Sequence, residues 1–251
     1  MLLRTLRRIA VVAAMAGCVY VARGYGRGTA ALTAVICLVL LASLTIWLPR
    51  AAHRTFEAGN YGRSAIYYHI LRWALLDRAS RLSVEVSLAA CDLARGDFVK
   101  SLRRLDRVDT SKISEATRSA WLNNRAYSLA RAGTDPGQAL DCATEAVELR
   151  PQVAGFRHTR GVALLALGRI DDAIRELDAV WSALDGADPP PLLEAERCFD
   201  LATAWSRKGE RAYARDYYER AHRAAPESLW ADRAVHHLDD ASAAAVLPEL
   251  V

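Results

Sequence analysis

The sequence predicts an all-α protein in which an N-terminal transmembrane helical hairpin precedes an α-solenoid of antiparallel helix pairs. Apolar segments near the N-terminus predict the hairpin. A glycine that returns at intervals of 37, 37, 35 and 41 residues, each time followed by small and apolar residues at helical spacing, predicts the solenoid. Helix-pair repeats have periods of about 34 to 47 residues. The recurring glycines are Gly59, Gly96, Gly133, Gly168 and Gly209.

Residues 1–50 are predicted to anchor the chain in a membrane, with helices at about 9–22 and 29–49. Thr29 to Leu48 holds twenty residues without a charge, enough for a helix to cross a hydrocarbon core of about 30 Å. The segment 9–22 is shorter and follows three arginines, so other interpretations stay open. They are a signal peptide, an interfacial helix, or a lipoprotein signal that ends at Cys18.

The arginines predict the orientation of this hairpin. Arg4, Arg7, Arg8, Arg50 and Arg54 flank the two apolar segments, whereas only two arginines lie in the loop between them. Positive residues stay on the cytoplasmic side, so we expect a multi-pass protein of the inner (cytoplasmic) membrane with its repeats in the cytoplasm. The alternative is a periplasmic location, which follows if the first segment is cleaved or does not span.

The solenoid is predicted over residues 51–240, with a tail at 241–251. Counting back from Gly59 places the first helix of the first repeat at about residues 45–58, directly after the membrane segment. In the second repeat, Glu85 and Asp92 stand where large apolar residues are usual. A C-terminal helix around residues 228–238 is predicted to cap the last repeat, because the end of a stacked array needs a polar outer face.

The pattern resembles the tetratricopeptide repeat (TPR), a helix pair of about 34 residues. The match is best over residues 156–180 and 198–226, and it covers about 170 residues as four to five repeats. The matching residues are Gly161, Gly168, Ala173, Leu177 and Val180 in one unit, and Leu201, Ala202, Gly209, Ala214, Tyr218, Ala221 and Pro226 in the other.

This resemblance implies a concave groove lined by the first helix of each pair, which binds a protein or peptide ligand. Asn123 or Asn124 is the candidate to hold the backbone or terminal carboxylate of a partner. The usual set of several Lys and Asn residues is absent, which favours a general peptide groove over a chaperone-type carboxylate clamp. The remaining candidate groove residues are Tyr127, His158, Thr159, Asp200 and Arg207.

Composition and motifs argue against several other classes. The net charge is +4 from scattered arginines, so nucleic acid is not predicted as a partner. The five cysteines include no C-x-x-C pair, and His236 and His237 point about 100° apart on a helix, so neither set predicts a metal site. No Walker loop, nucleophile elbow or H-E-x-x-H helix occurs. We therefore expect no enzymatic activity and no cofactor.

The predicted function is a membrane-anchored scaffold or adaptor at a bacterial membrane. Its partners would be a protein or peptide in the groove and the lipid bilayer around the N-terminal helices. Two alternatives remain open at this point. One is an outward-facing assembly factor for secretion, pilus or envelope biogenesis, and the other is a regulatory subunit of a membrane enzyme complex.

Overall fold

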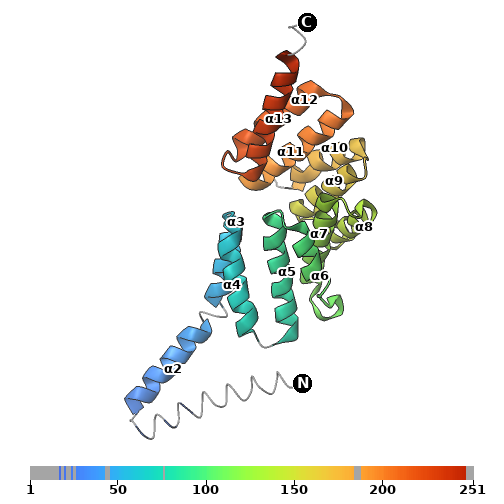
Figure 1. Ribbon diagram of the computed structural model, residues 1–251. Helices are drawn as coiled ribbons and strands as arrows, with labels where there is room; N and C mark the ends of the chain where they lie inside the picture. Colours follow the sequence, from blue (N-terminus) through green and yellow to red (C-terminus); the bar gives the residue numbers. More distant parts are fainter. Residues whose placement is uncertain are drawn as a thin grey trace. The chain divides into compact units, whose positions relative to one another are not determined.

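The computed structural model describes residues 17, 20, 24, 27–42, 46–75, 77–183 and 188–246, and every regular element among them is a helix (Figure 1). The chain divides into two compact units, Met1–Thr117 and Arg118–Val251. The predicted domain limits at residues 50 and 240 fall inside helices α3 and α13. The predicted tail lies outside the described residues from position 247 onward.

The first unit contains α2 (Arg27–Ala42), α3 (Leu48–Glu57), α4 (Tyr61–Ala74), α5 (Arg78–Ala94), α6 (Phe98–Leu105) and the 3-10 turn Thr110–Lys112. Helices α3, α4 and α5 each pack against the next helix along the chain. Leu48, Ala52, Leu71, Val84 and Leu88 form the centre of its core.

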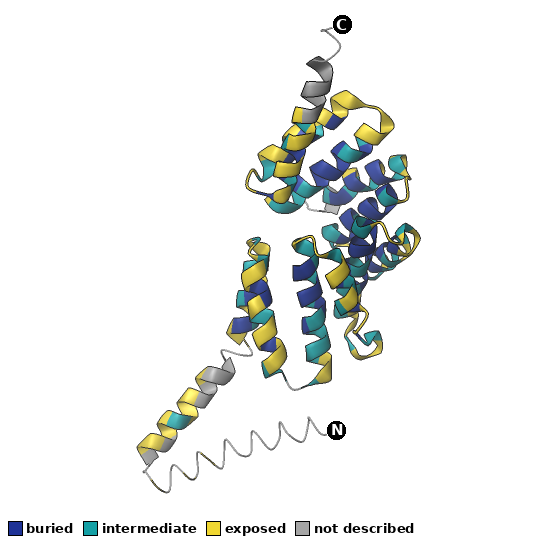
Figure 2. Ribbon diagram, viewed as in Figure 1, coloured by how far each residue is buried: buried dark blue, intermediate teal, exposed yellow. Residues whose placement is uncertain are grey.

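The second unit contains most of α7 (Glu115–Ala132), followed by α8 (Pro136–Leu149), α9 (Ala154–Ala166), α10 (Ile170–Asp178), the 3-10 turn Ala179–Ala183, α11 (Pro191–Lys208), α12 (Arg211–Ala224) and α13 (Leu229–Val246). From α8 onward each helix packs against its successor, and α7, α9 and α11 each contribute eight buried residues (Figure 2). Leu122, Val147 and Phe156 join α7, α8 and α9 in one apolar cluster.

The five predicted turn glycines all adopt left-handed backbone conformations. Gly59, Gly96, Gly133, Gly168 and Gly209 have φ between 66° and 88°. Side chains with a Cβ atom rarely adopt this conformation, so glycine allows the chain to leave one helix and start the next within a few residues. The repeating glycine therefore marks the turn inside each helix pair, as the sequence predicted.

The two acidic residues that departed from the apolar pattern belong to a network of ion pairs. Asp92 is buried, and its carboxylate lies 2.7 Å from Arg95, 3.0 Å from Lys100 and 3.0 Å from Arg104. Arg104 also pairs with Glu85 at 2.7 Å. Buried charges require such partners, so the departure is compensated within the second repeat.

The structure contradicts the predicted multi-pass inner-membrane location. Across the described residues, no helix combines the length and apolar character needed to cross a bilayer. Helix α2 has 16 residues, Arg27–Ala42. Leu48, assigned to the predicted membrane helix 29–49, instead begins α3 and lies in the core of the first repeat. Apart from Gly17 and Tyr20, the predicted helix 9–22 lies outside the described residues.

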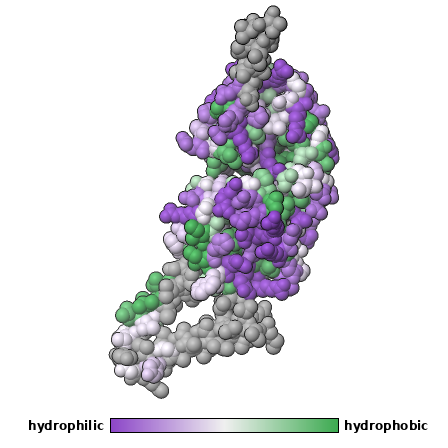
Figure 3. Space-filling view, in the orientation of Figure 1, coloured by the Kyte–Doolittle hydropathy of each residue, from purple (hydrophilic) through white to green (hydrophobic). Residues whose placement is uncertain are grey.

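Helix α2 nevertheless has an apolar surface. Leu32, Val35, Ile36 and Val39 are each at least half exposed, at the spacing of one helix face (Figure 3). The segment predicted as a transmembrane helix at 29–49 contains most of α2 and the start of α3, and neither a spanning hairpin nor a bilayer as partner is supported.

Candidate functional site

The candidate site of the second unit is built on the first helices of its repeats, α7, α9 and α11. Each has a small buried residue where its neighbours approach, namely Ala126, Gly161 and Ala202. A Cβ atom on Gly161 would lie 2.7 Å from two carbon atoms of Leu177, which shows how close α9 and α10 are. This close packing brings polar side chains of the first helices within hydrogen-bonding distance of one another.

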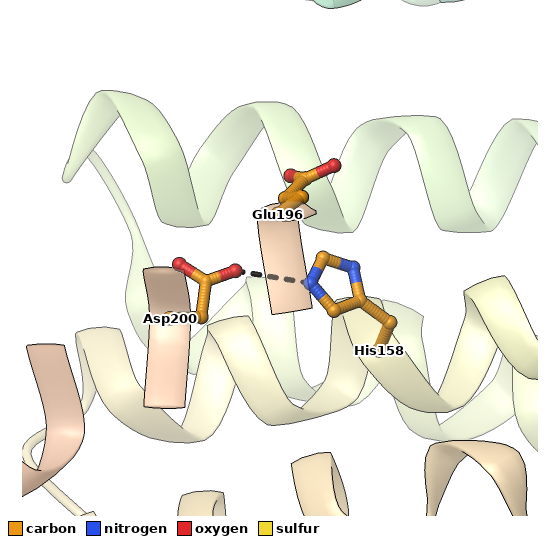
Figure 4. A group of neighbouring side chains, drawn as sticks. All are labelled: His158, Glu196 and Asp200. Carbon is orange, nitrogen blue, oxygen red and sulfur yellow. Dashed lines mark hydrogen bonds and ion pairs between the residues drawn. The ribbon is translucent and has the colours of Figure 1, made fainter. Parts of the chain in front are cut away.

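Five of these side chains form one network, which we call the Arg131 cluster: Tyr127, Arg131, His158, Glu196 and Asp200. Arg131 donates two hydrogen bonds to Asp200, at 2.8 and 2.7 Å, and a third to Glu196 at 3.0 Å. The hydroxyl of Tyr127 donates to the same oxygen of Glu196. The Nε2 atom of His158 lies 3.0 Å from Asp200 (Figure 4). Because an ionised carboxylate only accepts, that nitrogen carries the hydrogen.

Aromatic rings cover the guanidinium group of Arg131. Its central carbon lies 5.0 Å from the ring centre of Tyr127 on α7 and 4.7 Å from that of Trp230 on α13. Cations are attracted to the faces of aromatic rings at such distances. Arg131 thus links residues of α7, α11 and α13, and its partner Asp200 adds α9 through His158.

The charges of the cluster stabilise one another. Burial alone raises the pKa of Asp200, but the charge of Arg131 and the hydrogen bond from His158 outweigh it and hold this pKa below its usual value. Burial alone lowers the pKa of Arg131, but Asp200 and Glu196 raise it well above its usual value. Burial raises the pKa of Tyr127 well above its usual value, so its hydroxyl remains protonated and donates to Glu196. The cluster therefore holds a charged guanidinium against ionised carboxylates.

His158, Glu196 and Asp200 are also close enough to be examined as metal ligands, since one ligand atom from each lies within 4.8 Å of the others (Figure 4). The guanidinium of Arg131 already lies within 3.0 Å of both carboxylates, at the place where a cation would be neutralised. A metal ion there would be repelled by the guanidinium of Arg131. The two carboxylates therefore fit Arg131 as their cation better than they fit a metal ion.

The predicted groove residues have different environments. Tyr127, His158 and Asp200 come together in the cluster, although all three are buried. Asn123 is half-buried and Asn124 is buried. Two others have local partners. The hydroxyl of Thr159 donates to Gly155 within its own helix at 3.1 Å, and exposed Arg207 donates to the Leu165 carbonyl at 2.8 Å. These groove assignments remain predictions.

Sequence reasoning missed Arg131, Glu196 and Trp230. A signal was present, because Arg131 and Asp200 are 69 residues apart, about two repeat lengths. Residues of opposite charge at that separation occupy first helices on either side of a third, here α9, and the packing of these helices places them within hydrogen-bonding distance. The apolar periodicity alone contains no information about that packing.

Three of the five cysteines, Cys91, Cys142 and Cys198, have described side chains, and none of the three shows a sign of activation. Burial, with the Glu194 carboxylate 3.2 Å away, raises the pKa of Cys198 to about 12. Burial also raises the pKa values of Cys91 and Cys142. A nucleophilic cysteine needs a lowered pKa, so these three thiols have the properties of packing residues.

Consecutive helix pairs joined at left-handed glycines define a TPR-type α-solenoid. A thermophilic TPR protein of Thermus thermophilus has this fold, with a TM-score of 0.54 and 19% identity over 75% of this chain and 96% of its own. YrrB, a TPR protein with an unusual peptide-binding site, aligns with a TM-score of 0.45 and 16% identity over 77% of this chain and 91% of its own. MamA aligns with a TM-score of 0.46 and 16% identity over 73% of this chain and 100% of its own. No family profile and no curated protein sequence matches the chain.

Proposed function

We propose that this chain is a non-enzymatic TPR scaffold that binds a protein or peptide segment along the first-helix face of its second unit. The solenoid supports this proposal because it exposes a long surface made by several helices, which an extended segment can follow. The Arg131 cluster supports it too, because interactions among α7, α9, α11 and α13 preorganise that face. Preorganised surfaces lose less free energy when they bind.

The observation that carries the proposal is the unsatisfied oxygen of Asn123. Asn123 lies one helical turn before Tyr127 and two turns before Arg131, so all three form one stripe on α7. Its side-chain oxygen is buried and accepts no hydrogen bond from the described residues. Leaving such an acceptor without a donor costs about 1–3 kcal/mol. Asn123 as a whole is only half-buried, so a rotation of its side chain would let this oxygen accept a hydrogen bond from a backbone N–H of a bound segment.

The test uses peptides selected from a random displayed library against the full chain, with affinities measured by fluorescence anisotropy. Replacing Asn123 with Ala removes one hydrogen bond of about 0.5–1.5 kcal/mol, so we expect the dissociation constant to rise about 2- to 13-fold. Thermal stability should not fall, because the substitution also removes a buried acceptor without a partner. The matched control is Glu148→Ala, an exposed position on α8 that should leave binding unchanged.

Two results would contradict the proposal. One is a set of selected peptides whose affinity is the same for Asn123→Ala and for the unaltered chain. The other is an equal loss of affinity for Glu148→Ala, which would place the binding surface on the second helices instead.

A further inference from the structure

A second surface lies in the first unit, at a cleft beside α3. The cleft has a volume of about 470 Å³, within the range of sites that bind small ligands or side chains of a partner. Its lining consists of Ile46 and Trp47, which precede α3, of Arg50, Ala51, Arg54 and Thr55 on α3, and of Tyr67 on α4. Leu48 and Ala52, on an adjacent side of α3, point into the core. The cleft residues are therefore available on the outside.

The apolar part of the cleft is aromatic. The rings of Trp47 and Tyr67 meet edge to face, with their centres 6.1 Å apart. Trp47 is 60% exposed and Ile46 is 52% exposed. Large apolar side chains that remain exposed side by side favour an interaction surface.

The polar part of the cleft is positive. Arg50 and Arg54 lie one helical turn apart, and no carboxylate of the described residues pairs with either. Arg50 donates only to the Ile46 carbonyl of its own helix, at 3.1 Å. The acidic residue of α3, Glu57, pairs with His53 at 3.2 Å. Two cations one turn apart match two carboxylates at the same spacing on a second helix.

The repeat architecture explains why a helix fits here. The first helices α5, α9 and α11 each pack between two neighbouring helices along the chain. Helix α3 packs on α4 (Figure 1), and the cleft is lined by residues of these two helices and by the two residues before α3. Stacked repeats bury their apolar faces against the next helix in the stack, so a helix is the kind of partner that fits an apolar surface on α3.

We propose that the α3 cleft binds an amphipathic helix of a partner protein that carries two carboxylates one turn apart and an aliphatic or aromatic side chain between them. The carboxylates pair with Arg50 and Arg54, and the apolar side chain packs against Trp47 and Tyr67. This surface belongs to the first unit and does not depend on the proposed role of Asn123 in the second.

The test is a selection from a helix-biased peptide library against the full chain, followed by binding measurements on the selected peptides. We expect enrichment of Asp or Glu at positions i and i+4 beside Leu, Ile or Phe. Arg50→Ala and Arg54→Ala should each weaken binding about ten-fold or more, and added salt should weaken it further. The matched control is Arg103→Ala, an exposed arginine on α6 that should change nothing.

Three outcomes would overturn this assignment. The first is a selected set without acidic enrichment, and the second is binding that survives the double variant Arg50→Ala/Arg54→Ala. The third is binding of the chain to anionic phospholipid vesicles that requires both arginines while no peptide is selected. If every selected peptide loses affinity for the Asn123→Ala variant but not for the arginine variants, the α3 proposal fails while the proposed function of the second unit stands, so failures of the two proposals are distinguishable.

Discussion

The Arg131 cluster makes a quantitative prediction about stability. Asp200 is 1% exposed and accepts two hydrogen bonds from Arg131, whose side chain is 14% exposed. Replacing Arg131 with Met leaves Asp200 buried with only His158 as a described partner. Removing one member of a buried pair costs about 3–5 kcal/mol of unfolding free energy. Asp200→Asn keeps the shape but loses the charge, at a cost of about 1.5–3 kcal/mol.

The double variant Arg131→Met/Asp200→Asn separates this pair from its surroundings. If the two side chains act through their direct contact, the double variant loses that contact only once. Its destabilisation should then be smaller than the sum of the two single values by about 2 kcal/mol. Urea unfolding of the full chain, followed by circular dichroism, measures all four free energies. As a matched control, Arg175→Met changes an exposed pair with Asp172 and should alter stability by less than about 0.5 kcal/mol.

Additive effects would refute this reasoning. If the coupling between Arg131 and Asp200 is below about 0.5 kcal/mol, the contact does not contribute as the geometry indicates. If Arg175→Met lowers the unfolding free energy as much as Arg131→Met does, the loss comes from replacing any arginine with methionine and not from the buried ion pair.

Two further predictions concern packing and pH. Gly161→Ala should lower the unfolding free energy by about 1–3 kcal/mol, because the new methyl group would overlap fully buried Leu177. Thermal unfolding measures this loss. The matched control is Gly155→Ala, where a Cβ atom would meet no atom within 4 Å, so this variant should be as stable as the unaltered chain. Asp200 has a lower pKa in the folded chain than in the unfolded chain, where it is about 3.9, so its ionised carboxylate stabilises the fold. This stabilisation is fully present above the unfolded pKa and is lost as the pH falls through the lower folded pKa. Urea titrations at several pH values should therefore show a shallower decline below about pH 4 for Asp200→Asn than for the unaltered chain, and equal declines would contradict the assignment.

The fold was predictable because its turns leave a local signature. Each left-handed conformation selects glycine, as at Gly168 and Gly209, and the packing of paired helices selects small residues such as Ala173 and Ala214. Those constraints act within one repeat, so a single sequence displays them. The fold shared with a solved TPR protein agrees with this prediction.

The membrane prediction failed because hydropathy does not distinguish a membrane helix from a helix buried in a protein core. Residues 29–48 have no charge, but Leu48 packs with Leu71 and Leu88 in the first repeat. An apolar residue has the same hydropathy in a lipid bilayer and in a protein core. Only the tertiary contacts of Leu48 distinguish the two.

The cluster was only partly predictable for a different reason. Tyr127, His158 and Asp200 were named because they lie on first helices, where a groove was expected. Their association with Arg131 and Glu196 depends on how the helices from α7 to α11 pack together, which is determined by many contacts. No local sequence pattern contains that information.

The long reach of Arg131 limits how the array can change in length. Repeat arrays grow and shrink by gain or loss of whole units, which is tolerated when each unit contacts only its neighbours. Here the pair Arg131–Asp200 bridges over the unit of α9 and α10, and His158 on α9 contributes to it. Deleting that unit would remove His158, and duplicating it would separate Arg131 from its carboxylates. The number of repeats between α7 and α11 is therefore coupled to the stability of this charge network.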